Sequence, residues 1–183
     1  MVGGCGSCST VLGARLAGVT PAGNMPESLP LLMGDTVKAI EAFDKHMPQE
    51  VPRIALVDIL RDEVEESLNV SKALKEKLRG VSLNTPVERG GVSPELVTEL
   101  RVRLDLAGFG HVEIMVSGGF TPDKIRKFVE SGAPVSVFGV GGYIAKSVPK
   151  TYRYDIKEIE GRPTAKRGRI PGITNSPRLT RVI

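Results

Sequence analysis

Residues 112–119 read Val-Glu-Ile-Met-Val-Ser-Gly-Gly, an apolar run typical of a buried strand that ends in two glycines. Thr121-Pro122-Asp123 follows, and a capping residue before a proline predicts the start of a helix. A second apolar run, 135–138, ends in Gly139-Val140-Gly141. Glycine turns after neighbouring strands are typical of the phosphate site of a (β/α) barrel. We therefore expect main-chain N–H groups to bind a phosphate at Ser117, Gly118, Gly119, Gly139, Val140 and Gly141; the alternative is that these glycines only form tight turns.

The rest of the chain alternates short apolar runs with longer amphipathic ones, which predicts an α/β fold of parallel βα units. Strands are expected at 19–23, 54–58, 81–84, 112–116 and 135–138. Helices are expected to start near Asp35, Asp62, Pro94 and Pro122, with a shorter helix at 9–16. Five strands are too few for a closed eight-stranded barrel. The prediction is an irregular, incomplete TIM-type barrel: either a small open sheet, or part of a larger barrel whose remaining strands come from another chain or were lost.

The helix that starts near Asp62 carries an apolar stripe, and its charged residues are expected to face water without any chemical role. The stripe consists of Val64, Leu68, Ala73, Leu74 and Leu78. The charged residues are Glu63, Glu65, Glu66, Lys72, Lys75 and Lys77.

Charge is distributed unevenly over the 183 residues, whose net charge is +4. Residues 146–183 contain ten Lys or Arg against three acids. We predict two domains: a partial barrel with phosphate-binding loops at 1–148, and a basic β extension and tail at 149–183. The extension is expected to be a hairpin with arms at 152–159 and 164–167 around a turn at 160–163. Nucleic acid binding is not expected, because aromatic residues do not alternate with the basic ones.

The N-terminus shows no signal peptide, and no apolar run is long enough to span a bilayer, so a cytoplasmic protein without membrane contact is predicted. Cys5 and Cys8 have the spacing of half a zinc site or of a redox pair. The only histidines, His46 and His111, fall in different βα units. We therefore predict two free thiols and no metal site.

Four segments together resemble the C-terminal half of the nicotinate phosphoribosyltransferase family. They are Gly80-Val81-Ser82-Leu83-Asn84-Thr85-Pro86 with Arg89, Val116-Ser117-Gly118-Gly119-Phe120, Phe138-Gly139-Val140-Gly141, and residues 160–168. Residues 6–10, 23–26, 34–36 and 55–58 are similar to the segments that precede them in that family. The resemblance implies an irregular barrel with an added β domain. It also implies transfer of phosphoribose from phosphoribosyl diphosphate to nicotinate in NAD biosynthesis.

The same resemblance implies roles for individual residues. Asp58 and Asn84 would line the ribose and the leaving group, and Arg89 would lie near an anion. Two alternatives stay open: Asp58 caps the next helix, and Arg89 forms a surface salt bridge. Mg²⁺ would accompany phosphoribosyl diphosphate. The expected partners are this substrate, nicotinate, and either further copies of the chain or a companion N-terminal chain.

Three positions depart from the family pattern. Glu27 stands where the family carries a histidine that ATP phosphorylates, so coupling to ATP is not expected. Ser82 and Asn84 replace an arginine and an aspartate, which removes a bidentate anion clamp and a carboxylate. Two other functions therefore remain open: a non-catalytic phosphate- or nucleotide-binding remnant, and a quinolinate phosphoribosyltransferase-like enzyme. The chain is also compatible with a fragment that is inactive alone.

Overall fold

The computed structural model describes residues 4–149, 151 and 155–177. The chain divides into two compact units, of which the first ends at Lys146 and the second begins at Ser147. The sequence predicts a domain boundary two residues further on, between 148 and 149.

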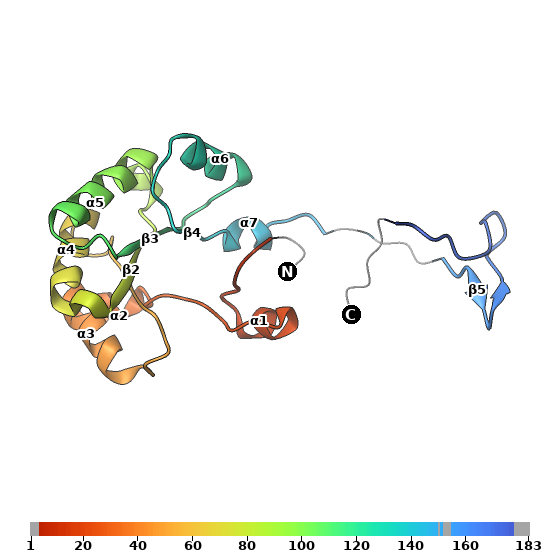
Figure 1. Cartoon of the computed structure of the whole chain (residues 1–183), viewed down its shortest axis with the longest axis horizontal. Helices are drawn as coiled ribbons and strands as arrows, with labels where there is room; N and C mark the ends of the chain where they lie inside the picture. The colour runs from red at the N-terminus through yellow and green to blue at the C-terminus, as the bar shows by residue number, and fades with distance from the viewer. Residues whose placement is uncertain (1–3, 150, 152–154, 178–183) are drawn as a thin grey trace. The chain divides into compact units, whose positions relative to one another are not determined.

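The first unit is built on four parallel strands, which neighbour one another in chain order (Figure 1). They are β1 (Arg53–Leu56), β2 (Leu78–Leu83), β3 (Glu113–Val116) and β4 (Val137–Phe138). Ala55 pairs with Val81, and Val81 pairs with Ile114. The α/β class and four of the predicted strands are confirmed. Within the described residues the sheet is open, with β1 and β4 at its edges, and no closed TIM-type barrel forms.

The fifth predicted strand, at 19–23, is wrong. That segment makes only an isolated parallel bridge between Cys8 and Pro21. A proline has no N–H to donate, so it interrupts a hydrogen-bonded ladder. The chain reaches the edge of β1 slightly later, where the N–H of Met25 donates to the carbonyl of Ile54 at 2.9 Å.

The predicted helix starts are confirmed by capping residues that lie next to them. Asp35, Asp62 and Thr121 each accept hydrogen bonds from main-chain N–H groups of the first turn, and Ser93 and Thr10 do the same. The helices are α1 (Val11–Ala17), α3 (Thr36–His46), α4 (Glu63–Leu74), α5 (Pro94–Leu106) and α6 (Pro122–Glu130). Two short helices were not expected, α2 (Ser28–Met33) and α7 (Gly141–Ala145), and neither were the 3₁₀ turns η1 (Lys75–Lys77) and η2 (Val87–Arg89).

The core lies between the sheet and the neighbouring helices α3, α4 and α5 (Figure 1). It is formed by fully buried aliphatic residues such as Ile40, Val70, Val81 and Leu100. Three phenylalanines extend it toward α6: the Phe120 and Phe128 rings are 5.1 Å apart, and Phe138 lies 5.4 Å from Phe120. This aromatic packing fixes α6 against the ends of β3 and β4.

The second unit contains an antiparallel hairpin of β5 (Glu158–Ile159) and β6 (Arg162–Pro163). Glu160 and Gly161 connect the strands, and both have positive φ, as a two-residue hairpin turn requires. The predicted hairpin therefore forms, but its turn is shorter than expected and its second arm begins at Arg162 instead of Thr164. Its first arm is shorter than predicted as well: residues 155–157 are not in a strand, and residues 152–154 lie outside the described residues. None of the described helices is long and apolar enough to cross a bilayer.

Candidate functional site

The candidate site lies at the carboxyl ends of the four strands, which meet at one edge of a parallel sheet. Asp58 follows β1, and its carboxylate accepts a hydrogen bond from the main-chain N–H of Asn84, which follows β2. A Cβ added to Gly118 would lie 2.5 Å from the Asn84 amide oxygen, so the loop after β3 packs directly against Asn84. A Cβ on Gly139 would likewise lie 2.9 Å from Cβ of Ser117. The predicted residues of all four strand ends are thus brought together.

Asp58 has unusual electrostatics. Its partly buried position raises the pKa of the carboxyl group from 3.8 to about 6. The hydrogen bond from Asn84 opposes this shift, while the charges of Glu63 and Glu66 add to it. Asp58 therefore changes its charge near neutral pH, which is the property expected of a functional carboxylate.

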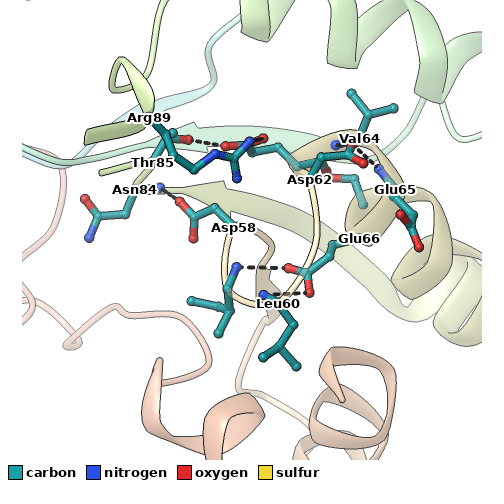
Figure 2. A network of polar contacts seen from close by, with 12 residues as sticks. Asp58, Leu60, Asp62, Val64, Glu65, Glu66, Asn84, Thr85 and Arg89 are labelled. Atoms are coloured by element: carbon teal, nitrogen blue, oxygen red, sulfur yellow. Dashed lines mark hydrogen bonds and ion pairs between the residues drawn. The ribbon is translucent and has the colours of Figure 1, made fainter. Parts of the chain in front are cut away.

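Glu63 and Glu66 in α4 correct the expectation that the charged residues of this helix all face water. Both are almost completely buried, with exposed fractions of 3% and 1%. Figure 2 shows Glu66 near Asp58, and its carboxylate accepts a hydrogen bond from the loop after β1. The Glu63 carboxylate accepts a hydrogen bond from Thr85 in the loop after β2. The buried residues 63, 66, 67, 70, 71 and 74 follow the helical period, so the two acids share the inner face of α4 with Val70 and Leu74. Val64, Leu68 and Ala73 of the predicted stripe are only partly buried.

Arg89 lies in the 3₁₀ turn η2 and pairs with Glu63. Its guanidinium nitrogen is 3.2 Å from a Glu63 carboxylate oxygen, and about half of its side chain is exposed. Contact between Arg89 and a bound anion stays a prediction.

The glycine loops, defined here as residues 117–119 and 139–141, differ in the use of their N–H groups. Those of Ser117 and Gly139 donate to the carbonyls of Leu83 and Val116 at 2.8 and 2.7 Å, so both serve the sheet. Within the described part of the chain, the N–H groups of Gly118, Gly119, Val140 and Gly141 donate to no protein group. Four of the six predicted donors therefore remain available to an anion.

Lys124, which sequence reasoning missed, stands in the first turn of α6 next to the first glycine loop. Its ammonium lies 3.5 Å from the Gly118 carbonyl oxygen and 4.4 Å above the centre of the Phe120 ring. Partial burial lowers the pKa of Lys124. The available signal was its position, five residues after the glycine pair and inside a capped helix start.

Other predicted positions are separate from these contacts. Glu27 is exposed and precedes α2 without capping it. Cys5 and Cys8 are free thiols, and a hydrogen bond from Thr10 lowers the pKa of Cys8. Among the described residues, no group of three or more His, Cys, Asp or Glu side chains could hold a metal ion.

An open parallel α/β sheet with polar residues and glycine loops at its strand ends is consistent with a phosphoribosyltransferase-type domain. The chain is similar to a nicotinate-nucleotide pyrophosphorylase from Pyrococcus furiosus, with 44% sequence identity and a TM-score of 0.78. The match covers 94% of this chain and 43% of that protein, so the chain spans less than half of its length. A nicotinate phosphoribosyltransferase from Vibrio cholerae matches 68% of this chain and 30% of its own, at 17% identity and a TM-score of 0.54, which shows a shared fold alone. No family model matches the sequence.

Proposed function

We propose that the chain is the part of a phosphoribosyltransferase that binds phosphoribosyl diphosphate and supports its reaction with a pyridine carboxylic acid. The observation that carries this proposal is the contact of Asp58 and Asn84 at the strand ends, directly beside Gly118. The likeness at 44% identity favours the quinolinate phosphoribosyltransferase-like alternative over the nicotinate phosphoribosyltransferase-like interpretation, whose structural support has 17% identity.

The proposed reaction is a displacement at the anomeric carbon of ribose. The pyridine nitrogen forms the new C–N bond, the bond to the diphosphate oxygen breaks, and diphosphate leaves with the electron pair. Positive charge develops on the ribose, and the deprotonated Asp58 carboxylate stabilises it electrostatically. The Asn84 amide orients the sugar hydroxyls.

The 5′-phosphate has its own set of proposed donors. The free N–H groups of Gly118, Gly119, Val140 and Gly141 bind its oxygens, and Lys124 supplies a positive charge next to the first glycine loop. Mg²⁺ enters with phosphoribosyl diphosphate as part of the substrate. ATP has no role in this scheme, because Glu27 cannot serve as the phosphorylated imidazole.

The test measures diphosphate release and nucleotide formation from phosphoribosyl diphosphate and Mg²⁺. Nicotinate and quinolinate are supplied in separate reactions, with and without ATP, and with and without a companion chain that provides the remaining length of the Pyrococcus relative. Asp58→Asn should abolish the reaction at every pH, while Asp123→Asn, an exposed acid on α6, should leave it unchanged. If no nucleotide forms under any condition while inorganic phosphate still binds, the non-catalytic remnant replaces this proposal.

A further inference from the structure

The first turn of α4 carries two buried carboxylates whose charges act on Asp58 in the candidate site. Glu63 and Glu66 are three residues apart, so they project from the same face of the helix. Replacing buried charges by apolar residues of similar size is often neutral or stabilising. The gain in stability alone therefore does not explain why α4 has two buried acids.

Glu66 holds the loop that follows β1. Its two carboxylate oxygens accept hydrogen bonds from the main-chain N–H groups of Ile59, at 3.1 Å, and Leu60, at 3.2 Å. Thr36, the first residue of α3, donates its hydroxyl to the same carboxylate at 2.6 Å. Ile59 and Leu60 come directly after Asp58. Glu66 therefore fixes the conformation of the loop that contains Asp58 (Figure 2).

Glu63 holds the loop that follows β2. Its carboxylate accepts a hydrogen bond from the Thr85 hydroxyl at 2.7 Å and forms an ion pair with the Arg89 guanidinium at 3.2 Å. Thr85 is buried and comes directly after Asn84. A single helical turn thus determines the path of both loops that carry the proposed ribose-binding residues.

We propose that Glu63 and Glu66 are positioning residues, which fix Asp58 and Asn84 relative to each other for binding of the ribose of phosphoribosyl diphosphate. This inference rests on the proposed function. Misplacement of a reacting group by about 1 Å can reduce a rate about 100-fold, so two loops that meet at a substrate need a rigid common support. Side chains fixed by buried hydrogen bonds provide such a support.

The hydrogen-bond pattern predicts different effects for the two amide substitutions. In Glu66→Gln, both carboxylate oxygens already accept N–H groups, so the new NH₂ group must face a donor. In Glu63→Gln, the amide oxygen can accept from Arg89 while the NH₂ group donates to the Thr85 hydroxyl, which is able to accept. Glu66→Gln should therefore disturb its loop, whereas Glu63→Gln should preserve its own.

The experiment compares the full chain with Glu63→Gln, Glu66→Gln and the matched control Glu65→Gln, an exposed acid of the same helical turn. Hydrogen exchange monitors the Ile59 and Leu60 amides, carbon NMR monitors the titration of the Asp58 carboxyl, and calorimetry measures binding of phosphoribosyl diphosphate with Mg²⁺. Glu66→Gln should speed exchange at both amides about tenfold or more and weaken binding about tenfold or more. Glu63→Gln should lower the Asp58 pKa, because it removes a nearby negative charge, and leave exchange unchanged. Glu65→Gln should change none of the three.

Unchanged exchange and unchanged affinity in Glu66→Gln would overturn the inference, and so would faster exchange with full affinity, because the residue would then be only structural. If Glu66→Gln fails to fold, Thr36→Val is the substitute, because it removes one of the three hydrogen-bond donors to Glu66. Thr36→Val should also speed exchange and weaken binding, but by smaller factors. A wild-type chain that does not bind phosphoribosyl diphosphate would contradict the proposed function instead, and the exchange rates and Asp58 titration would still decide whether α4 orders the two loops.

Discussion

Asp58 binds its proton more tightly in the folded protein than an ordinary aspartate does, since its pKa is raised from 3.8 to about 6. Folding therefore favours the protonated form, and the free energy of unfolding should fall as pH rises from about 4 to about 6. Asp58→Asn keeps an oxygen that can accept the Asn84 N–H and removes this dependence. Urea unfolding at several pH values should show the variant more stable than wild type at about pH 7, with the advantage gone below about pH 4. A constant difference across this range would contradict the raised pKa.

Gly118 is a position where the candidate site has little room for a side chain. Its φ is +90°, and an added Cβ would lie 2.5 Å from the amide oxygen of Asn84. Gly118→Ala should lower the free energy of unfolding by about 1–3 kcal/mol and reduce affinity for inorganic phosphate. Gly142→Ala is the matched control, because no atom lies within 4 Å of the corresponding Cβ and Gly142 is not one of the proposed phosphate donors. Denaturant unfolding and calorimetry check both, and equal behaviour of the two variants would refute the crowding at Gly118.

Arg53 holds together the connection from α3 to β1. Its guanidinium makes five hydrogen bonds, to the Asp44 side chain and to the carbonyls of Asp44, Met47, Pro48 and Val51. Only 8% of its side chain is exposed. Arg53→Met removes the shared donor of these acceptors, of which Pro48 keeps the Val51 N–H and the Asp44 carboxylate keeps Lys77. The variant should cost about 3–5 kcal/mol in unfolding experiments. Arg79→Met, which removes an exposed ion pair with Glu113, should cost less than about 1 kcal/mol, and similar losses in both would exclude a special role for Arg53.

Helix α4 passes into β2 through η1 alone, and Lys75 at this junction has φ +50° and ψ −128°. Residues other than glycine rarely adopt this backbone conformation. Lys75→Gly should therefore raise the free energy of unfolding by about 1 kcal/mol, whereas the neighbouring Lys77→Gly should not raise it. Thermal and denaturant unfolding would check this, and a loss of stability in Lys75→Gly would show that the junction carries no strain.

At the level of elements, the sequence predicted those parts that local chemistry determines. Capping residues such as Asp62 and Thr121 mark helix starts because they bind adjacent N–H groups, and four apolar runs became strands. The prediction of a strand at 19–23 failed although the sequence shows Pro21, which has no N–H to donate to a ladder. Glu63 and Glu66 were misplaced for a different reason, because their partners come from other elements, which the sequence does not bring together: Thr36, Ile59, Leu60, Thr85 and Arg89. The strand-end residues were brought together as expected, since parallel topology alone places them at one edge.

At the level of the whole molecule, several large apolar residues remain exposed. Leu16 of α1 is 80% exposed and Leu32 of α2 is 85% exposed, and within the described residues no further strand pairs with the outer edges of β1 and β4. Such surfaces favour association. We predict that the isolated chain self-associates in light scattering and becomes a defined complex with a companion chain. Leu32→Glu should weaken this association, and Leu106→Glu, at an equally exposed position of α5, should not. A monodisperse wild-type monomer with a sharp two-state unfolding transition would contradict the prediction.

The order of the sheet has a consequence for biosynthesis. Because β1, β2, β3 and β4 neighbour one another in the order in which they are translated, each new strand can dock on the one just completed. No strand has to wait for a distant segment, which keeps the contact order low for a parallel sheet. The growing chain therefore always presents one free edge to the next βα unit leaving the ribosome. Loss of the C-terminal end during synthesis would remove the β5–β6 hairpin first and β4 next, and would leave the pairing of β1 with β2 that carries Asp58 and Asn84 intact.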